Sequence, residues 1–212
     1  MVNDLVERGA RLNERDCCSN TPLLLALKEG YYDIAWKLLD AKVDIHVKDA
    51  VNDTALIISA RKGRLELVSK LLELGARMTD RNKEGDTPLF TAYTQGNMEV
   101  VYFMIENKAD INEKNGKGES LLMHAIKDNN LLVCNYLVEK GINVNSKDHE
   151  GNTALILASQ KGNYSIVKYL VEKGANVHEK NRQFKNALYY SSPEYHFKKD
   201  IYNLLEPLQN KA

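Results

Sequence analysis

Residues that could bind a metal or act as a nucleophile are few and widely separated in this chain. Five histidines are spread over the sequence: His46, His124, His149, His178 and His196. Zinc sites need histidines and cysteines at short, fixed spacings, and the sequence has no such cluster. No nucleophile, base and orienting group can be combined at any spacing. We therefore predict no metal site, no cofactor and no catalytic centre, so that the chain is not an enzyme.

The cysteines fit a reducing compartment better than a disulfide framework. Cys17 and Cys18 are adjacent, which matches no zinc spacing, and they fall where we expect a loop tip. There they can be exposed and oxidisable, but a paired redox function needs a different spacing. Cys134 is expected to be a small buried hydrophobic residue, because alanine or valine fills the same helix position elsewhere.

The segment Gly116-Lys117-Gly118-Glu119-Ser120 has some likeness to a phosphate-binding loop. It lacks the earlier glycine at the required distance and the strand that should precede it. We interpret it as a hairpin tip followed by a helix cap.

The composition excludes several classes of protein. The 212 residues include 29 Lys and Arg and 29 Asp and Glu, so the formal net charge is zero, and 43% are hydrophobic. No apolar run approaches the ~18 residues of a membrane span, and a neutral chain binds nucleic acid poorly. The first residues, Met1 to Asp4, do not begin a secretion signal. We expect the cytoplasm of the source cell or of a host cell, with a periplasmic location open if the N-terminus was truncated.

The sequence repeats every 33 residues, and this repetition determines the expected fold. A short hydroxyl or amide residue, here called the anchor, recurs six times and is followed two residues later by leucine. The anchors are Thr21, Thr54, Thr87, Ser120, Thr153 and Asn186. Nine residues after the first five anchors come Gly30, Gly63, Gly96, Asn129 and Gly162.

Each repeat predicts a helix, a turn, a second helix and a loop. The anchor can cap a helix by accepting a bond from a free backbone N–H, and Pro22 and Pro88 follow two anchors, where a missing N–H costs nothing. The glycine or asparagine nine residues on can adopt the left-handed conformation that ends a helix. The second helix carries one apolar stripe, as in Leu67, Val68 and Leu71, which only stacking of neighbouring repeats can bury. We therefore expect an all-α solenoid of stacked helix pairs.

These repeats resemble the ankyrin repeat family, whose motif begins Thr-Pro-Leu. The chain has Thr21-Pro22-Leu23 and Thr87-Pro88-Leu89, and later Gly174-Ala175-Asn176-Val177. The resemblance implies an ankyrin-repeat solenoid of helix-turn-helix units joined by β-hairpin-like loops. Full repeats are expected at 21–53, 54–86, 87–119, 120–152 and 153–185, within one ankyrin-repeat domain spanning 1–212.

One departure from the family is consistent along the chain. The family's histidine, three residues after the anchor, is replaced by an apolar or aromatic residue. The replacing residues are Leu24, Ile57, Phe90, Met123, Ile156 and Tyr189. We expect apolar burial to take the place of the histidine's hydrogen bond.

Both ends are expected to be atypical, since terminal repeats must shield a core face from water. Residues 1–20 form a partial repeat, because residues 1–16 align with residues 133–148. The chain thus begins inside a second helix, and we favour truncation of a longer protein over an unusually thin natural cap.

Residues 186–212 read as a divergent capping repeat. They keep Asn186 and Leu188 but shift the later apolar residues by two positions, and Pro207 is expected to end the last helix. The alternative is a tyrosine-rich binding lobe that includes Tyr189, Tyr190 and Tyr195.

A row of cations is the most regular polar feature. One repeat position holds Arg15, Lys48, Arg81, Lys114, Lys147 and Lys180, and Asp or Asn follows each of them. Such a row could bind an acidic peptide or a phosphate backbone. We favour a structural role, because this pair is usual in the ankyrin hairpin and exposed ion pairs contribute only about 0–1 kcal/mol each.

Partner recognition, if it follows the family, uses the hairpin tips and the solvent ends of the first helices, which are expected to line one concave face. The candidate partner-binding residues are Lys28, Glu29, Ala50, Val51, Arg61, Lys62, Lys83, Glu84, Thr94, Gln95, Lys117, Lys127, Asp128, His149, Glu150, Gln160, Lys161 and Arg182. Cations outnumber anions at the helix ends, which leans towards an acidic partner. A separate candidate is an outer contact patch, because Trp36 and Tyr102 share a second-helix position that should face outward.

Three classes of function follow, in order of preference. The first is a monomeric scaffold that binds another protein on the concave face. The second is the ankyrin-repeat portion of a larger enzyme or effector whose catalytic domain lies outside these residues. The third is a nucleic-acid binder that uses the cation row, which requires steeply salt-dependent binding and is not favoured. No membrane contact is expected.

Overall fold

The computed structural model describes residues 10–192 and 198–210. The expectations for residues 1–9, Tyr195 and His196 lie outside these ranges. The chain forms two compact units, Met1–Asp110 and Ile111–Ala212, and each is described by itself.

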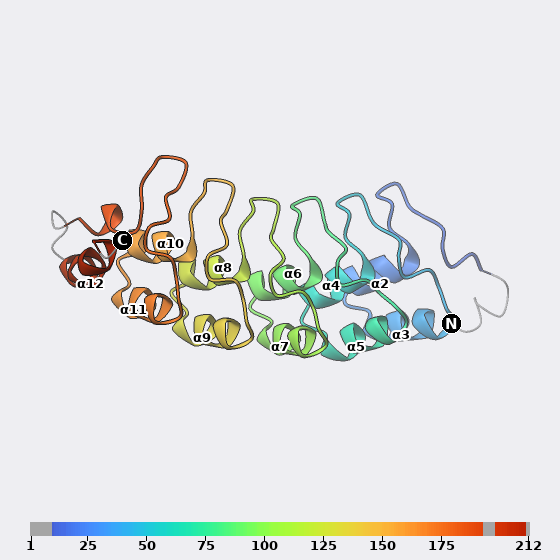
Figure 1. The fold of residues 1–212 in the computed structure, drawn as a ribbon. Helices are drawn as coiled ribbons and strands as arrows, with labels where there is room; N and C mark the ends of the chain where they lie inside the picture. The colour runs from blue at the N-terminus through green and yellow to red at the C-terminus, as the bar shows by residue number, and fades with distance from the viewer. Residues whose placement is uncertain (1–9, 193–197, 211–212) are drawn as a thin grey trace. The chain divides into compact units, whose positions relative to one another are not determined.

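Helix pairs build the first unit over its described residues. Its helices are α2 (Pro22–Glu29), α3 (Tyr32–Asp40), α4 (Ala55–Arg61), α5 (Leu65–Glu73), α6 (Pro88–Thr94) and α7 (Met98–Glu106). The first helix of each pair packs against its neighbour, α2 on α4 and α4 on α6, while α5 packs on α7 in a second layer. The loops between pairs project beyond the first-helix layer, so tips and first helices share one side of the unit (Figure 1).

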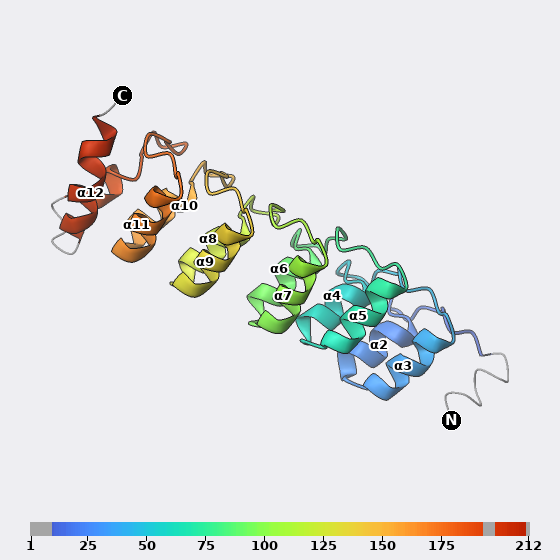
Figure 2. The same ribbon diagram turned by 60° about the horizontal axis from the view of Figure 1, so that its bottom comes forward.

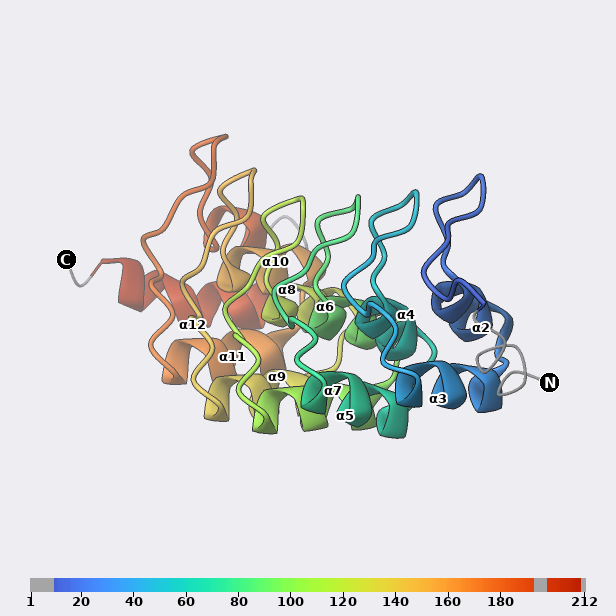
Figure 3. The same ribbon diagram turned by 90° about the vertical axis from the view of Figure 1, so that its right-hand side faces the viewer.

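The second unit repeats this arrangement and ends in a divergent segment. Its elements are α8 (Leu121–Lys127), α9 (Leu131–Glu139), α10 (Ala154–Lys161), α11 (Tyr164–Glu172), a 3-10 turn η1 (Tyr189–Ser191) and α12 (Lys199–Gln209). The divergent segment is η1 with α12, which the sequence predicts to be a capping repeat and which is called the cap below. α8 packs on α10 and α9 on α11, and the cap follows with η1 on α10 and α12 on α11. The two helix layers and the hairpins beyond the first layer are visible in Figures 2 and 3.

The all-α prediction is confirmed, because the described residues form helices and no named strand. One isolated bridge, between Lys114 and Ser120, marks the hairpin character of a loop. The helices fall one pair to each full repeat expected from the sequence. The assignment of 1–212 to a single repeat domain stays a prediction.

The anchors cap the first helices as predicted. The Thr54 hydroxyl accepts a hydrogen bond from the backbone N–H of Ile57 at 3.3 Å, and Ser120 accepts one from Met123 at 3.4 Å. The same bond is made by Thr21, Thr87 and Thr153. Each bond satisfies a donor that the first turn leaves without a partner.

Left-handed residues end the helices, also as predicted. After the first helix, Gly30 has φ 81° and Asn129 has φ 57°. After the second helix, Lys42 and Lys108 have φ 55° and 66° at a position where other repeats have glycine. Those glycines are Gly75, Gly141 and Gly174. A lysine in this conformation is strained, so these two repeats use an unfavourable residue at a position that suits glycine.

The core lies between the two helix layers of each unit. Five of the six residues that replace the family's histidine are buried: Leu24, Ile57, Phe90, Met123 and Ile156. The sixth, Tyr189, is 56% exposed. Apolar burial therefore replaces the histidine everywhere except in the cap.

The C-terminal cap departs from the repeat pattern in two ways. Its first helix is reduced to the turn η1, although the Asn186 side chain still accepts a bond from the Tyr189 N–H at 2.9 Å. The prediction that Pro207 ends the last helix is wrong, because α12 continues to Gln209. In the last helical turn, a proline removes few backbone bonds. The Gln209 side chain also holds this end by bonding Asn186 at 3.0 Å and His178 at 2.8 Å.

Candidate protein-binding surface

Each hairpin tip is clamped by the Asp or Asn that follows the cation row. Asp49 Oδ1 accepts hydrogen bonds from the backbone N–H groups of Val51 and Asp53, both at 2.8 Å. The same side-chain-to-backbone clamp occurs at Asp16, Asn115, Asp148 and Asn181. Such bonds satisfy the backbone donors of the turn. The tip is thereby fixed without using its outermost side chains.

Neighbouring tips within a unit are also joined through their backbones. In the first unit the Ala50 N–H donates to Cys18 O at 3.1 Å, and the Lys83 N–H donates to Val51 O at 2.9 Å. In the second unit the corresponding bonds are from His149 to Lys117 at 3.1 Å and from Arg182 to Glu150 at 2.9 Å. The predicted tip residues are all exposed: Ala50, Val51, Lys83, Glu84, Lys117, His149, Glu150 and Arg182. Each unit thus presents exposed side chains on a fixed backbone.

The cation row fastens hairpins to one another. Lys114 Nζ donates to the carbonyl of Lys147 at 2.8 Å, and Lys147 Nζ donates to the carbonyl of Lys180 at 3.3 Å. In the first unit Lys48 pairs with Asp80 of the next hairpin at 3.0 Å. These contacts give three members of the row, Lys48, Lys114 and Lys147, the structural role that the sequence favoured, while Arg81 bonds the carbonyl of Gly85 in its own hairpin.

Several helix-end cations form ion pairs or hydrogen bonds with acidic or amide side chains of the same unit. Arg61 makes a two-pronged ion pair with the buried carboxylate of Asp53. Lys28 bonds Asn20 Oδ1 and Asp49 Oδ2, both at 2.6 Å. Burial alone raises the pKa of Asp49, but bonds from Lys28 and from backbone N–H groups lower it overall. These cations are therefore partly neutralised within the fold.

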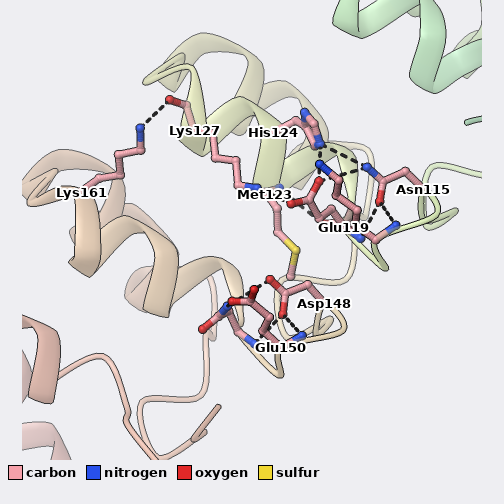
Figure 4. A network of polar contacts seen from close by, with 11 residues as sticks. Asn115, Glu119, Met123, His124, Lys127, Asp148, Glu150 and Lys161 are labelled. Atoms are coloured by element: carbon pink, nitrogen blue, oxygen red, sulfur yellow. Dashed lines mark hydrogen bonds and ion pairs between the residues drawn. The ribbon is translucent and has the colours of Figure 1, made fainter. Parts of the chain in front are cut away.

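Lys127 is held in the same way by Glu119, at the centre of a polar network in the second unit. Glu119 is buried and accepts bonds from Lys127, from His124 Nε2 at 2.7 Å and from Asn115 Nδ2 at 3.0 Å. Figure 4 shows these side chains converging on the carboxylate. Burial raises the pKa of Glu119, but the bonds from Lys127, Asn115 and His124 outweigh it and lower the pKa to about 2.

The remaining helix-end residues lie towards solvent. The exposed members of the predicted set are Glu29, Lys62, Thr94, Gln95, Asp128 and Lys161, while Gln160 is half-buried. Among the charged members of this exposed group, two are cations and two are anions. The surface left for a partner is mixed in charge.

Family models of ankyrin repeats match residues 18–50, 38–115 and 95–181. These ranges cover well over half of the 212 residues.

The chain belongs to the ankyrin repeat family. Its structure is similar to the ankyrin repeat domain of Bcl-3, described as a unique member of the IkappaB protein family. That match has a TM-score of 0.83 and 27% sequence identity, covering 97% of this chain and 90% of the other. The search of curated proteins found no match. Ankyrin repeats are protein-interaction modules and are typically non-catalytic.

The outer face of this ankyrin-repeat chain holds the two aromatics expected there. Tyr102 is 39% exposed, whereas Trp36 is half-buried. Trp36 lines two shallow hollows of about 270 and 530 Å³ between second helices of the first unit. Beside them the Arg64 guanidinium lies 3.9 Å from the centre of the Tyr32 ring.

The three cysteines lie where the sequence predicts, two exposed and one buried. Cys17 and Cys18 are exposed with their sulfurs 3.9 Å apart, and Cys134 is buried, which raises the pKa of its thiol to about 12.

Among the described residues, no three His, Cys, Asp or Glu side chains come together as metal ligands. Every helix in that part of the chain is too short or too polar to cross a membrane.

Two features were missed in the sequence. One is the residue before the anchor in three repeats, Asn20, Asp53 and Glu119, whose side chain bonds the helix-end cation eight residues later. The spacing of eight residues between the two side chains is visible in the sequence and could have predicted these pairs. The other is Phe184, which is 85% exposed at the last hairpin and breaks a column that otherwise holds small residues.

Proposed function

We propose that this chain is a scaffold that binds a partner protein through the hairpin tips and exposed helix ends of each unit. The observation that carries the proposal is the fixed tip backbone with exposed side chains. The Asp and Asn clamps and the tip-to-tip bonds hold the backbone, so binding costs little ordering of the loops.

The residues proposed to contact the partner are those that the fold leaves exposed on this side. In the first unit they include Val51, Glu84 and Lys62, and in the second Glu150 and Lys161. Arg61 and Lys127 are secondary, because their charges are already paired with Asp53 and Glu119. The acidic partner suggested by the cation excess is correspondingly less favoured than a partner of mixed charge.

The test is affinity capture from the source cell, with the wild-type chain and matched variants as bait. Val51→Glu with Lys62→Glu changes the surface of the first unit, and Glu150→Lys with Lys161→Glu that of the second. Lys168→Glu, exposed on α11 in the second-helix layer, is the control.

We expect at least one of these two double variants to reduce capture of a specific protein about tenfold or more, which corresponds to about 1.4 kcal/mol of binding free energy. The control should capture it normally, and nuclease treatment should have no effect. Capture that survives both double variants but is lost in Trp36→Ala would assign binding to the outer face and refute the proposal.

A further inference from the structure

The last hairpin carries a residue that its backbone does not favour. Phe184 has φ 60° and is 85% exposed. The corresponding residues of the other tips, all with positive φ, are Ser19, Asn52, Gly85, Gly118 and Gly151. A bulky side chain is strained in this conformation, and this one gains little burial in return. A residue that is both strained and exposed indicates a role other than stabilising the fold.

The direction of the Phe184 side chain follows from its glycine counterparts. A Cβ atom on Gly118 would lie 3.0 Å from the backbone N of His149 in the next hairpin. A Cβ atom on Gly151 would lie 3.0 Å from the backbone N of Arg182. This column therefore faces the following hairpin. Phe184 is tolerated because no hairpin of the described chain follows it. Its Cβ points to the side where the next hairpin would lie.

The row of tip-to-tip hydrogen bonds stops at the same point. The carbonyls of Lys117 and Glu150 accept bonds from the next tips in the second unit. The next carbonyl in this column is that of Gln183, which accepts no hydrogen bond from the described residues. An exposed backbone edge whose acceptor has no partner among the described residues is a feature that extended segments use when they add to a fold.

Within the described residues, the capping helix packs on the neighbouring helices, while residues 182–184 of the last hairpin are exposed. α12 packs on α11 and on η1, with Ile201 and Leu205 buried against them. Figure 1 shows α12 level with the helices, whereas the last hairpin stands beyond them. The cap also contacts the base of this hairpin, where Gln209 bonds His178 and the Tyr190 hydroxyl accepts a bond from Asn181, but the tip residues 182–184 stay exposed.

The charge of this hairpin differs from that of the others. Residues 180–185 contain the cations Lys180, Arg182 and Lys185 and no acidic residue. The equivalent segments 15–20, 48–53, 81–86, 114–119 and 147–152 each contain at least one Asp or Glu. Lys185 also lies 4.6 Å from the centre of the Tyr189 ring, which adds a second exposed aromatic. The edge combines positive charge with aromatic surface.

We propose that this C-terminal hairpin edge, formed by residues 180–185, docks an extended acidic segment of a partner protein. A backbone N–H of the segment donates to Gln183 O, as the next tip would in a longer array. An apolar side chain of the segment covers the Phe184 ring, and its carboxylates face the cations. Apart from Arg182, this edge is separate from the tip and helix-end surface proposed above.

The test uses a fluorescein-labelled peptide in which Asp and Glu flank a central Leu, measured by anisotropy. Companion peptides carry Lys in place of the acids, or an N-methyl group on the backbone nitrogen of the Leu. Phe184→Gly removes the ring and relieves the backbone. Leu132→Ala, at a site 81% exposed on α9, is the matched control for loss of an exposed apolar residue.

We expect Phe184→Gly to weaken binding of the acidic peptide about tenfold or more, and both companion peptides to bind the wild type correspondingly less well. Leu132→Ala should bind as the wild type does. The melting temperature of Phe184→Gly should not fall, because glycine suits the positive φ.

Three outcomes would overturn the proposal: no binding of the acidic peptide to the wild type, equal binding by Phe184→Gly, or a lowered melting temperature in that variant. Self-association of the wild type that Phe184→Gly abolishes would assign the edge to a second copy instead. Glu150→Lys with Lys161→Glu leaves residues 180–185 unchanged and should retain peptide binding, so the two proposals can fail independently.

Discussion

Replacing Glu119 by glutamine removes the one charge that organises the polar network of the second unit. The carboxylate accepts bonds from Lys127, His124 and Asn115, and its side chain is only 10% exposed. A fall in pKa from 4.5 to about 2 on folding corresponds to about 3 kcal/mol of stability at neutral pH. The Lys127 side chain is 38% exposed, so water screens part of the pair. We expect Glu119→Gln to lower the free energy of unfolding by about 2 kcal/mol.

The pH dependence has a definite sign. Because the pKa of Glu119 is lower in the folded state, the carboxylate contributes its full stability above the unfolded value of 4.5. That contribution disappears as the pH falls from 4.5 to about 2. The wild type and Glu119→Gln should therefore converge in stability over this window.

Urea unfolding, followed by circular dichroism at a series of pH values, measures the difference directly. Glu172→Gln is the control, because it removes one negative charge from an exposed position of α11 in the same unit. It should change the free energy of unfolding by less than about 0.5 kcal/mol. The difference between the two variants isolates Glu119 from other acidic residues.

Equal stability of Glu119→Gln and Glu172→Gln at neutral pH would refute the role assigned to this network. A stability gap that persisted unchanged at pH 2 would do the same. If the network is as described, Glu119→Gln also releases Lys127 from its internal partner, which makes that cation more available to an acidic probe.

Three further predictions concern strain, capping and thiol reactivity. Lys108→Gly should raise the free energy of unfolding by about 1 kcal/mol in urea titrations, because glycine suits the φ of 66°, and the reciprocal Gly141→Lys should lower it by a similar amount. Lys198→Met should destabilise by about 1–3 kcal/mol in the same assay, since buried Lys198 Nζ donates to the carbonyls of Gln160 at 2.9 Å and Tyr190 at 3.0 Å; an unchanged value would contradict a capping role. With a chromogenic disulfide reagent, the two exposed cysteines should react in the native chain and buried Cys134 only after unfolding, and rapid native reaction of all three would count against its raised pKa.

The fold could be predicted from the sequence because its determinants are local and repeated. A hydroxyl at Thr54 caps a helix wherever it stands, and a left-handed Asn129 ends one in the same way as glycine. Each of these signals recurs at the same spacing, so one ambiguous repeat is corrected by the others. The cap was harder, because it occurs once: η1 and the continuation of α12 past Pro207 depend on contacts made only there.

The side-chain pairing on the candidate surface was less predictable for a physical reason. Whether Arg61 faces solvent or turns back to Asp53 depends on the competition between hydration and an ion pair, which sequence position alone does not decide. The buried carboxylate settles it, because Asp53 is 1% exposed and needs a charged donor. The exposure of other positions, such as Lys62 and Glu84, was predictable because the repeat does not need their side chains for packing or capping.

In the function proposed above, fold and recognition use different positions of the same hairpin. Asp49 holds the tip through backbone N–H groups, while Val51, two residues later, is 43% exposed. A change at the first position should unfold the tip, and a change at the second should alter only what the tip can bind. Phe184 is the exception, because a surface residue there strains the backbone that carries it. Glycine would suit the backbone better at this position, so the docking proposed for the last hairpin is what accounts for a phenylalanine there.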